Sequence, residues 1–216
     1  MNVLVLGATG GTGRALVSAL LDAEHSVSVF SRAAAPQPAF DSRVRVVQGD
    51  ALAPADLDRA MPGHDAVVVS LGLGPNPFAI RFGSAGPTHT VSRGTQNTLA
   101  AMERHGVRRV IVVSAFGTGD SWSDLPLPIR MFFRLFLMAS FRDKEVQEAA
   151  VRQSNTDWTI LRPVQLTNGP ETGAYLASPT GKAHGTPISR ADVAHYAVHS
   201  LADVSTHSAT VALSNR

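Results

Sequence analysis

The stretch Gly7-Ala8-Thr9-Gly10-Gly11-Thr12-Gly13 places four glycines in seven positions. It follows an apolar run at residues 3–6 and leads into a segment whose apolar residues have helical spacing. Glycine has no side chain, so a cluster this dense between a strand and a helix indicates that the backbone turns tightly and comes close to another group. The stretch therefore predicts a strand-turn-helix unit at the start of an α/β fold.

Three of these glycines have the spacing G-x-x-G-x-x-G, which is typical of a dinucleotide-binding loop. Gly7 permits the tight turn, Gly10 lets the backbone approach a pyrophosphate, and Gly13 lets the helix pack closely on the strand. The helix that follows offers unpaired N–H groups and the positive end of its dipole to the phosphates. A P-loop would need Gly-Lys-Ser/Thr, but Arg14 and Ala15 follow the last glycine. A tight turn that holds no ligand is the alternative.

Composition limits the other classes of function. The chain has 216 residues, of which 44% are hydrophobic and 17% charged, as is ordinary for one soluble globular domain. The net charge of +2 is small and the arginines are scattered, so we expect no nucleic-acid partner. Cysteine is absent, which excludes disulfides, thiolate metal sites and cysteine nucleophiles. His195 and His199 have an i, i+4 spacing without a third ligand, so we expect no metal site.

No targeting segment or bilayer-spanning stretch is evident. An apolar strand begins within the first residues, without a basic region or cleavage site before it. The most apolar later stretch, residues 125–141, contains Arg130 and Arg134 and is too short to span a bilayer. We therefore expect a cytoplasmic protein with no membrane contact, either a monomer or a homodimer.

Short β-branched runs alternate with helical patterns along the chain. Most of the runs are apolar at every position, which is typical of parallel strands covered on both faces. This alternation predicts a Rossmann-type α/β fold with a doubly wound parallel sheet. The expected strands are residues 3–6, 27–30, 44–47, 66–69, 110–113, 158–161 and 210–213, and the expected helices are residues 12–23, 54–60, 90–105, 128–153 and 190–201.

Residues 1–216 are expected to form a single NAD(P)-binding domain with a small C-terminal substrate-binding portion. Two stretches rich in Gly and Pro, residues 71–87 and 168–187, are predicted loops. Open α/β sheets bind ligands at the carboxyl edge of their strands, so we expect both loops there, on the substrate side. The last helix is expected to begin after Ser189, a predicted N-cap three residues before Asp192.

The end of the second expected strand indicates which dinucleotide is bound. Sites that prefer NAD usually place a carboxylate there to accept a hydrogen bond from the ribose 2′-OH. Here the strand ends Val29-Phe30-Ser31-Arg32, without an acidic residue. The Arg32 guanidinium can pair with a 2′-phosphate and Ser31 can add a hydrogen bond, so NADP(H) is the expected cofactor. A solvated arginine on a loop is the alternative.

Several other motifs are spaced along the chain: Val47-Gln-Gly-Asp50, Gly94-Thr-Gln-Asn97, Ala101-Met-Glu-Arg-His-Gly-Val-Arg-Arg-Val-Ile111, Val112-Val-Ser-Ala-Phe116, Thr172-Gly-Ala-Tyr175 and Ile188-Ser-Arg-Ala-Asp-Val193. Together with the glycine-rich loop they resemble the atypical short-chain dehydrogenase/reductases with an NmrA-like NAD(P)-binding domain. Within these, the chain is most similar to the biliverdin-IXβ reductase/flavin reductase group. The resemblance covers nearly the whole chain and is weaker for the substrate than for the superfamily.

The resemblance implies cofactor-binding roles for the matching positions. Gly7, Thr9, Gly10, Gly11, Thr12, Gly13 and Arg14 would lie at the cofactor phosphates, Arg32 at the 2′-phosphate, and Asp50 and Ala51 at the adenine. Ser70, Leu71 and Gly72 would flank the phosphates and the nicotinamide ribose. Ser114, Ala115, Phe116, Pro163 and Val164 would surround the nicotinamide, and Lys144 occupies the position of a cofactor-site lysine of the family.

The usual catalytic pair of this superfamily is missing. Most short-chain reductases protonate a carbonyl oxygen with a tyrosine four residues before a lysine, which lowers the tyrosine pKa. Lys144 stands at the lysine position, but Ser140 occupies the tyrosine position. This argues against ordinary ketone reduction and against sugar-nucleotide epimerisation. Reduction of a flavin or a tetrapyrrole needs less from the protein, because the substrate nitrogen can take a proton from solvent.

Ser114 is the candidate catalytic residue. The resemblance places it at the active site, where its hydroxyl can hydrogen-bond the substrate or the carboxamide; a strand-end serine satisfied by the backbone is the alternative. The sequence thus favours an NADPH-dependent oxidoreductase that transfers hydride to a planar acceptor, such as a flavin, quinone or tetrapyrrole. The alternative is an NmrA-like sensor that binds NADP(H) without turnover.

Overall fold

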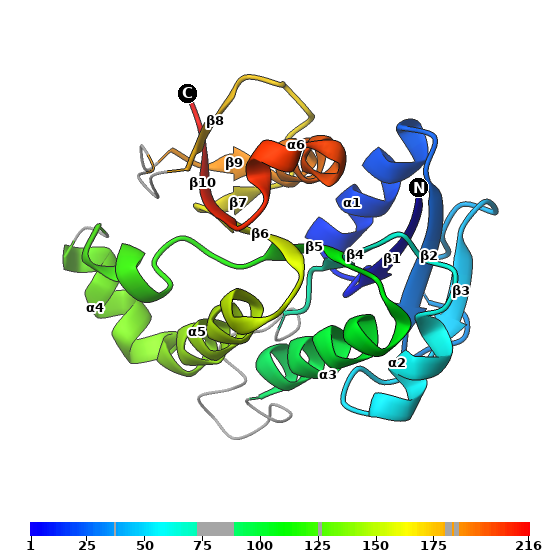
Figure 1. Cartoon of the computed structure of the whole chain (residues 1–216). Coiled ribbons are helices and arrows are strands. Elements are labelled where there is room, and N and C mark those ends of the chain that lie inside the picture. The colour runs from blue at the N-terminus through cyan, green and yellow to red at the C-terminus, as the bar shows by residue number, and fades with distance from the viewer. Residues whose placement is uncertain (37, 73–88, 125–126, 180–182, 184–185) are drawn as a thin grey trace.

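The computed structural model describes residues 1–36, 38–72, 89–124, 127–179, 183 and 186–216. They form an eight-stranded sheet with helices on both faces, which confirms the Rossmann-type α/β fold (Figure 1). The strands lie in the order β3-β2-β1-β4-β5-β6-β10-β8. Their bounds are β1 Asn2–Leu6, β2 Ser26–Ser31, β3 Arg45–Gln48, β4 Ala66–Val69, β5 Arg109–Val113, β6 Asp157–Pro163, β8 Tyr175–Ser178 and β10 Ala209–Asn215.

The helices divide between the two faces of this sheet. In Figure 1, α1 and α6 pack on one face, whereas α2, α3 and α5 pack on the other. β7 (Leu166–Thr167) and β9 (Ile188–Ser189) form a second, two-stranded sheet, and β9 leads directly into α6. The helix bounds are α1 Gly11–Asp22, α2 Pro54–Ala60, α3 Thr90–His105, α4 Leu127–Phe136, α5 Met138–Gln153 and α6 Arg190–Ala202, with 3-10 helices at Gly119–Asp124 and Val204–Thr206.

The strands are apolar at successive positions because both faces of the sheet are covered. On β1, Val3 and Val5 pack in the cluster below α1 and α6, while Leu4 and Leu6 pack against the opposite helices. All four side chains are fully buried. Burial of such a side chain contributes about 2 kcal/mol, so neither face of the strand tolerates a polar residue.

In the order of the sheet, all strands from β3 to β10 run parallel, as the sequence predicts, and β8 runs antiparallel. β1 pairs with β2 on one side and with β4 on the other, in register at Val3 with Val27 and Ala66. From β1 the chain continues to β2 and β3 on one side and then returns to β4 on the other side. The topological switch point of the sheet therefore lies between β1 and β4. The loops that follow β1, β2, β4, β5 and β6 consequently meet at one edge.

The prediction of one continuous helix at residues 128–153 is wrong. The chain forms α4 and α5, separated at Leu137, whose backbone leaves the helical range (φ −125°, ψ 3°). No glycine or proline marks this break in the sequence. A tertiary contact directs α5 instead: the buried Asp143 carboxylate accepts hydrogen bonds from Val91 N and Ser92 N (both 3.1 Å) at the start of α3.

The prediction that residues 168–187 are only loop is also wrong. Residues Tyr175–Ser178 form β8, which runs antiparallel to β10 with Leu213 opposite Ala177. β10 continues to Asn215, beyond its expected end, and its last residues supply this pairing. β8 is therefore an edge strand of the sheet. Most of the other predicted loop, residues 73–87, lies outside the described residues.

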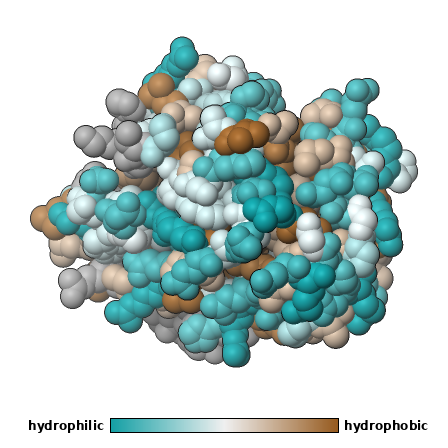
Figure 2. Space-filling view, in the orientation of Figure 1, coloured by the Kyte–Doolittle hydropathy of each residue, from teal (hydrophilic) through white to brown (hydrophobic). Residues whose placement is uncertain are grey.

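Hydrophilic side chains cover most of the face shown in Figure 2. Among the residues that the structure describes, no helix is long and apolar enough to cross a membrane. Leu127, Met131 and Leu135 are each more than half exposed on α4. The exposed apolar surface of the described helices is thus mostly on α4.

The turn between β1 and α1 leaves no room for two side chains. Gly7 has a positive φ of 77°, and a Cβ added there would overlap Ser70 O at the end of β4. A Cβ added at Gly13 would overlap Gly7 O. At Gly10 the nearest atom to an added Cβ is Gly7 O at 3.6 Å, an ordinary contact. Gly7 and Gly13 therefore serve the fold, whereas Gly10 leaves open space above the turn.

This difference predicts unequal effects of alanine at two glycines. Gly13→Ala is expected to lower the free energy of unfolding by about 3 kcal/mol, because the new methyl group forces backbone atoms apart. Gly10→Ala is expected to cost at most about 1 kcal/mol, since only the preference of the N-cap position is lost. Urea denaturation followed by circular dichroism measures both, and equal losses in the two variants would contradict the packing described here.

Candidate functional site

The glycine-rich loop lies at the carboxyl edge of the sheet. Gly10 is the N-cap of α1, and its carbonyl accepts a hydrogen bond from Arg14 N (2.9 Å). Thr9, Gly10 and Gly11 are exposed, and the N-cap residue is a glycine, which has no side chain to cap the helix. The first N–H groups of α1 are therefore available to an anion, as a pyrophosphate would require.

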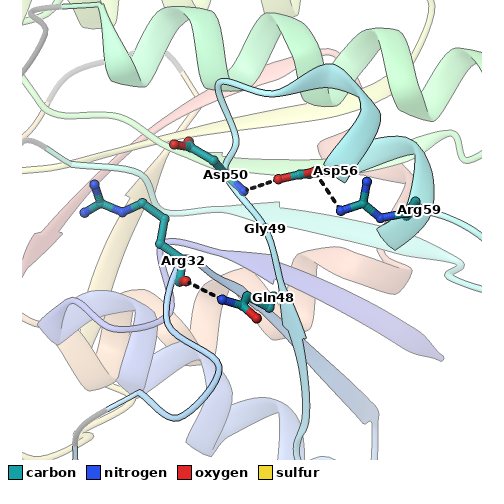
Figure 3. A pocket seen from close by; sticks show the side chains of 6 residues that line it. All are labelled: Arg32, Gln48, Gly49, Asp50, Asp56 and Arg59. Atoms are coloured by element: carbon teal, nitrogen blue, oxygen red, sulfur yellow. Dashed lines mark hydrogen bonds and ion pairs between the residues drawn. The ribbon is translucent and has the colours of Figure 1, made fainter.

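A cavity of about 410 Å³ lies at the carboxyl ends of β2 and β3 (Figure 3). It opens between the loop that follows β2 and the segment that connects β3 to α2. Two of the predicted cofactor-binding residues, Arg32 and Asp50, meet there. The full lining is Arg32, Gln48, Gly49, Asp50, Asp56 and Arg59.

The acidic side chains of this cavity are already hydrogen-bonded. Asp56 accepts hydrogen bonds from Asp50 N (2.8 Å) and Arg59 Nη2 (2.7 Å), and these donors hold the pKa of Asp56 below its usual value. Asp50 Oδ1 accepts a hydrogen bond from Leu52 N (2.9 Å). The exposed Arg32 guanidinium, by contrast, makes no hydrogen bond to a described residue (Figure 3). The cavity thus offers one cation to an anionic group.

Ala51 and Leu71, two more predicted residues, meet at Gly94 on α3. A Cβ at Gly94 would lie 2.9 Å from Leu71 Cδ1 and 3.2 Å from Ala51 Cβ, so glycine alone fits without a shift. Asn97 Nδ2 donates a hydrogen bond to Ala51 O (2.9 Å). The start of α3 therefore holds the segments after β3 and β4 together. Gly72, the last described residue before the gap, is exposed.

The carboxyl ends of β5 and β6 run side by side beyond the sheet. Ser114 N donates a hydrogen bond to Leu161 O (2.8 Å), and Phe116 N donates one to Pro163 O (2.9 Å). Val164 N donates a hydrogen bond to Leu213 O on β10 (3.0 Å). The predicted residues that share this part of the edge are Ser70, Ser114, Ala115, Phe116, Pro163 and Val164.

The buried hydroxyl of Ser114 donates a hydrogen bond to Glu148 Oε1 (2.6 Å). Glu148 also accepts hydrogen bonds from Arg162 Nε (3.0 Å), Arg162 Nη2 (2.7 Å) and Arg152 Nη2 (2.9 Å). Glu148 and Arg162 are each 1% exposed, so each charge needs the other in the interior. Because the Ser114 hydrogen points to a carboxylate that two guanidinium groups hold, its oxygen remains as an acceptor for another donor.

Sequence reasoning missed Glu148 and the Arg162 side chain. Two signals could have found them. Glu148 lies four residues after Lys144 and shares its helix face. Arg162 ends an otherwise apolar run on β6, where a charged side chain requires a partner.

Lys144 lies on α5, half-buried beside the end of β5. Its Nζ donates a hydrogen bond to Val113 O (3.3 Å), next to Ser114. Burial lowers the pKa of its ammonium group to about 8, and the Glu148 and Asp143 carboxylates partly oppose this shift. Lys144 is thus brought to the same place as the candidate catalytic serine.

Arg14 is directed away from the glycine-rich loop. Its Nη2 donates a hydrogen bond to Pro38 O (2.6 Å), and its guanidinium lies 4.6 Å from the centre of the Phe40 ring. Arg14 thereby fastens the segment between β2 and β3 to α1. Its contact with a cofactor phosphate stays a prediction.

A doubly wound sheet with a glycine-rich turn and an uncapped helix start at its switch point defines a Rossmann-type nucleotide-binding protein. The family model for NAD(P)H-binding proteins matches residues 7–204. The chain therefore belongs to the NAD(P)H-binding family, within the atypical short-chain dehydrogenase/reductases with an NmrA-like domain. This confirms the resemblance seen in the sequence.

Two relatives show how far the similarity extends. The UPF0659 protein YMR090W of Saccharomyces cerevisiae is 30% identical over 93% of this chain and 87% of its own length. The oxidoreductase stcQ of Emericella nidulans is 26% identical over 88% of this chain and 73% of its own length. The family to which the chain belongs thus includes oxidoreductases.

Three solved structures share the whole fold. A Bacillus halodurans protein described as a "putative NAD-dependent epimerase/dehydratase" has a TM-score of 0.82 and 28% identity, covering 100% of this chain and 94% of its own. ChuY, an anaerobilin reductase of Escherichia coli O157:H7, has a TM-score of 0.79 and 24% identity, covering 100% and 97%. A Veillonella parvula short-chain dehydrogenase/reductase in complex with NADP has a TM-score of 0.78 and 22% identity, covering 99% and 94%.

The depressed pKa of Lys144 predicts a pH-dependent stability. The unfolded chain binds this proton up to about pH 10.4, whereas the folded protein releases it near pH 8. Between these values the unfolded state binds more protons, so this group makes the folded protein more stable as pH rises. Lys144→Met removes the buried charge, so the variant is expected to be more stable than the wild type at pH 7. This difference in the free energy of unfolding is expected to shrink by about 2 kcal/mol between pH 7 and pH 10.

Urea denaturation of both proteins without cofactor at the two pH values measures this difference. Arg142→Met, an exposed change on the same helix, is the control and should show no such trend. A stability difference between Lys144→Met and wild type that is the same at both pH values would show that the charge is not disfavoured by folding.

Proposed function

We propose that this protein is an NADPH-dependent reductase that transfers hydride to a planar acceptor, such as a flavin, a quinone or a tetrapyrrole. The observation that carries the cofactor choice is the cavity at the end of β2. Its one guanidinium without a hydrogen bond to a described residue belongs to Arg32, and β2 ends without a carboxylate. A 2′-phosphate there would pair with Arg32, whereas Asp50 and Asp56 already accept backbone hydrogen bonds.

Different residues at the carboxyl edge of the sheet would contact different parts of the dinucleotide. Thr9, Gly11 and Thr12 present backbone N–H groups to the pyrophosphate, and Ala51 borders the adenine. Ser114, Phe116 and Val164 surround the nicotinamide end. When bound, NADPH supplies a hydride, and the acceptor nitrogen or oxygen takes the matching proton from solvent.

Ser114 acts as a hydrogen-bond acceptor in this proposal. Its own hydrogen is committed to Glu148, so Oγ can receive an N–H of the carboxamide or of the acceptor. Glu148 and Arg162 are buried on rigid elements, which fixes the direction of the Ser114 hydroxyl. Such positioning is the main requirement for hydride transfer between stacked rings.

The acceptor class rests on what the site lacks and on one structural neighbour. Ser140 stands where a proton-donating tyrosine would be, so an acceptor that draws its proton from solvent suits this chain. The name of ChuY describes reduction of a tetrapyrrole, and its fold matches this chain over its full length. The same missing tyrosine also fits the second candidate, a sensor that binds NADP(H) without turnover.

Turnover separates these two functions. Purified protein mixed with NADPH and FMN, riboflavin, a quinone or biliverdin is expected to oxidise the cofactor, seen as loss of nicotinamide absorbance. Ser114→Ala is expected to lower kcat about tenfold through loss of one aligned acceptor, with little change in NADPH affinity. Ser18→Ala, an exposed serine on α1, is the matched control. Tight NADPH binding without oxidation by any acceptor would favour the sensor.

The cofactor preference is tested at Arg32. Arg32→Glu is expected to weaken NADPH binding at least 100-fold, because it replaces an ion pair with a like-charge contact. NADH affinity should change little, since NADH lacks the 2′-phosphate. Arg43→Glu, an exposed arginine paired with Asp41 outside the cavity, controls for the change in net charge. Fluorescence titration of the wild type and both variants measures these affinities, and an equal loss for NADPH and NADH would refute the 2′-phosphate assignment.

A further inference from the structure

The first residue of α6 reaches back over the glycine-rich loop. A Cβ added at Gly11 would lie 2.9 Å from Arg190 Nε and 3.1 Å from Arg190 Cδ. The Arg190 side chain therefore lies directly against the first residue of α1, whose N–H groups face outward. The guanidinium next to the N-terminus of α1 thus belongs to Arg190, a residue near the other end of the chain.

A buried hydrogen-bond network holds Arg190 in this place. Ser189 Oγ caps α6 by accepting a hydrogen bond from Asp192 N (2.9 Å). The Asp192 carboxylate, 1% exposed, accepts hydrogen bonds from Ser189 Oγ (2.9 Å), Thr172 N (2.8 Å) and Gly173 N (3.0 Å). These bonds keep the pKa of Asp192 below its usual value despite its burial. The start of α6 and the segment at residues 172–173 are thus one rigid unit.

Toward the described residues, most of the donor capacity of Arg190 is unused. Among the described residues its only hydrogen bond is from Nη1 to Asn168 Oδ1 (2.6 Å). A guanidinium carries five N–H donors, so Arg190 has several left for an anion. Arg14, the cation that the sequence places next to the loop, is bonded to Pro38 instead. A pyrophosphate carries two negative charges, and backbone N–H groups alone neutralise them only in part.

We propose that Arg190 is a pyrophosphate-binding residue that clamps the cofactor against the start of α1. This inference rests on the proposed function, because it needs a dinucleotide in the site. Asn168 is a positioning residue in this arrangement: it holds the guanidinium in place before the ligand arrives, which reduces the cost of ordering a long side chain. The same hydrogen bond ties residues 168–173, on the predicted substrate side, to the cofactor phosphates.

Arg190→Gln tests the clamp with little risk to the fold, because glutamine can still donate a hydrogen bond to Asn168. NADPH is expected to bind at least about tenfold more weakly, as is typical when a hydrogen bond to a charged group is lost. Adenosine 2′-monophosphate has no pyrophosphate and should bind the variant and the wild type within about twofold. Arg190→Lys keeps the charge and should recover most of the NADPH affinity.

Calorimetric titration of both ligands against each variant gives these values. Arg104→Gln, an exposed arginine on α3 paired with Asp58, is the matched control for lost charge and should bind both ligands as the wild type does. Unchanged NADPH affinity in Arg190→Gln, or an equal loss for the two ligands, overturns the clamp while leaving the proposed function intact. A wild type that binds no NADPH overturns both.

Discussion

The close approach of the β1–α1 turn to the end of β4 is the constraint on which the rest of the site depends. The space that a side chain would fill at Gly7 is occupied by Ser70 O, and the space at Gly13 by Gly7 O. This contact sets the start of α1 against the switch point of the sheet, where the crevice of an open α/β fold forms. A larger residue at either position would move the helix N-terminus, and its outward N–H groups, away from the other strand ends.

Buried charge fixes the other end of the same edge. Glu148 joins three elements, because it bonds Ser114 after β5, Arg162 on β6 and Arg152 on its own helix. Removal of Glu148 would leave the buried Arg162 guanidinium with the exposed Asp120 carboxylate as its remaining ionic partner among the described residues. The Glu148–Arg162 pair thus offsets the cost of burying both charges, and it fixes the direction of the Ser114 hydroxyl.

Local patterns predicted the parts of the fold that local physics decides. Continuous apolar runs located the parallel strands, glycine spacing located the turn, and Ser189 proved to be the cap of α6. The sequence did not reveal the break at Leu137 or the strand β8, because the contact of Asp143 with α3 and the pairing with β10 are tertiary.

The sequence indicated where the candidate site residues lie along the sheet edge, but it did not reveal the contacts that they make with distant partners. The glycines, Arg32 and Ser114 lie where the motif order places them. Glu148 could not be paired with Ser114 by spacing, because the two are 34 positions apart. Arg190 is similarly remote from Gly11 in the chain, although its side chain lies against Gly11 in the folded protein.

α5 makes hydrogen bonds at both ends of the carboxyl edge of the sheet. Asp143 on this helix holds the first turn of α3, and Gly94 and Asn97, further along α3, hold the segment at Ala51. Glu148, five positions further along, holds Ser114. A single helix therefore supports both the segment at Ala51 and the hydroxyl of Ser114, and a displacement of α5 would move both ends of this edge.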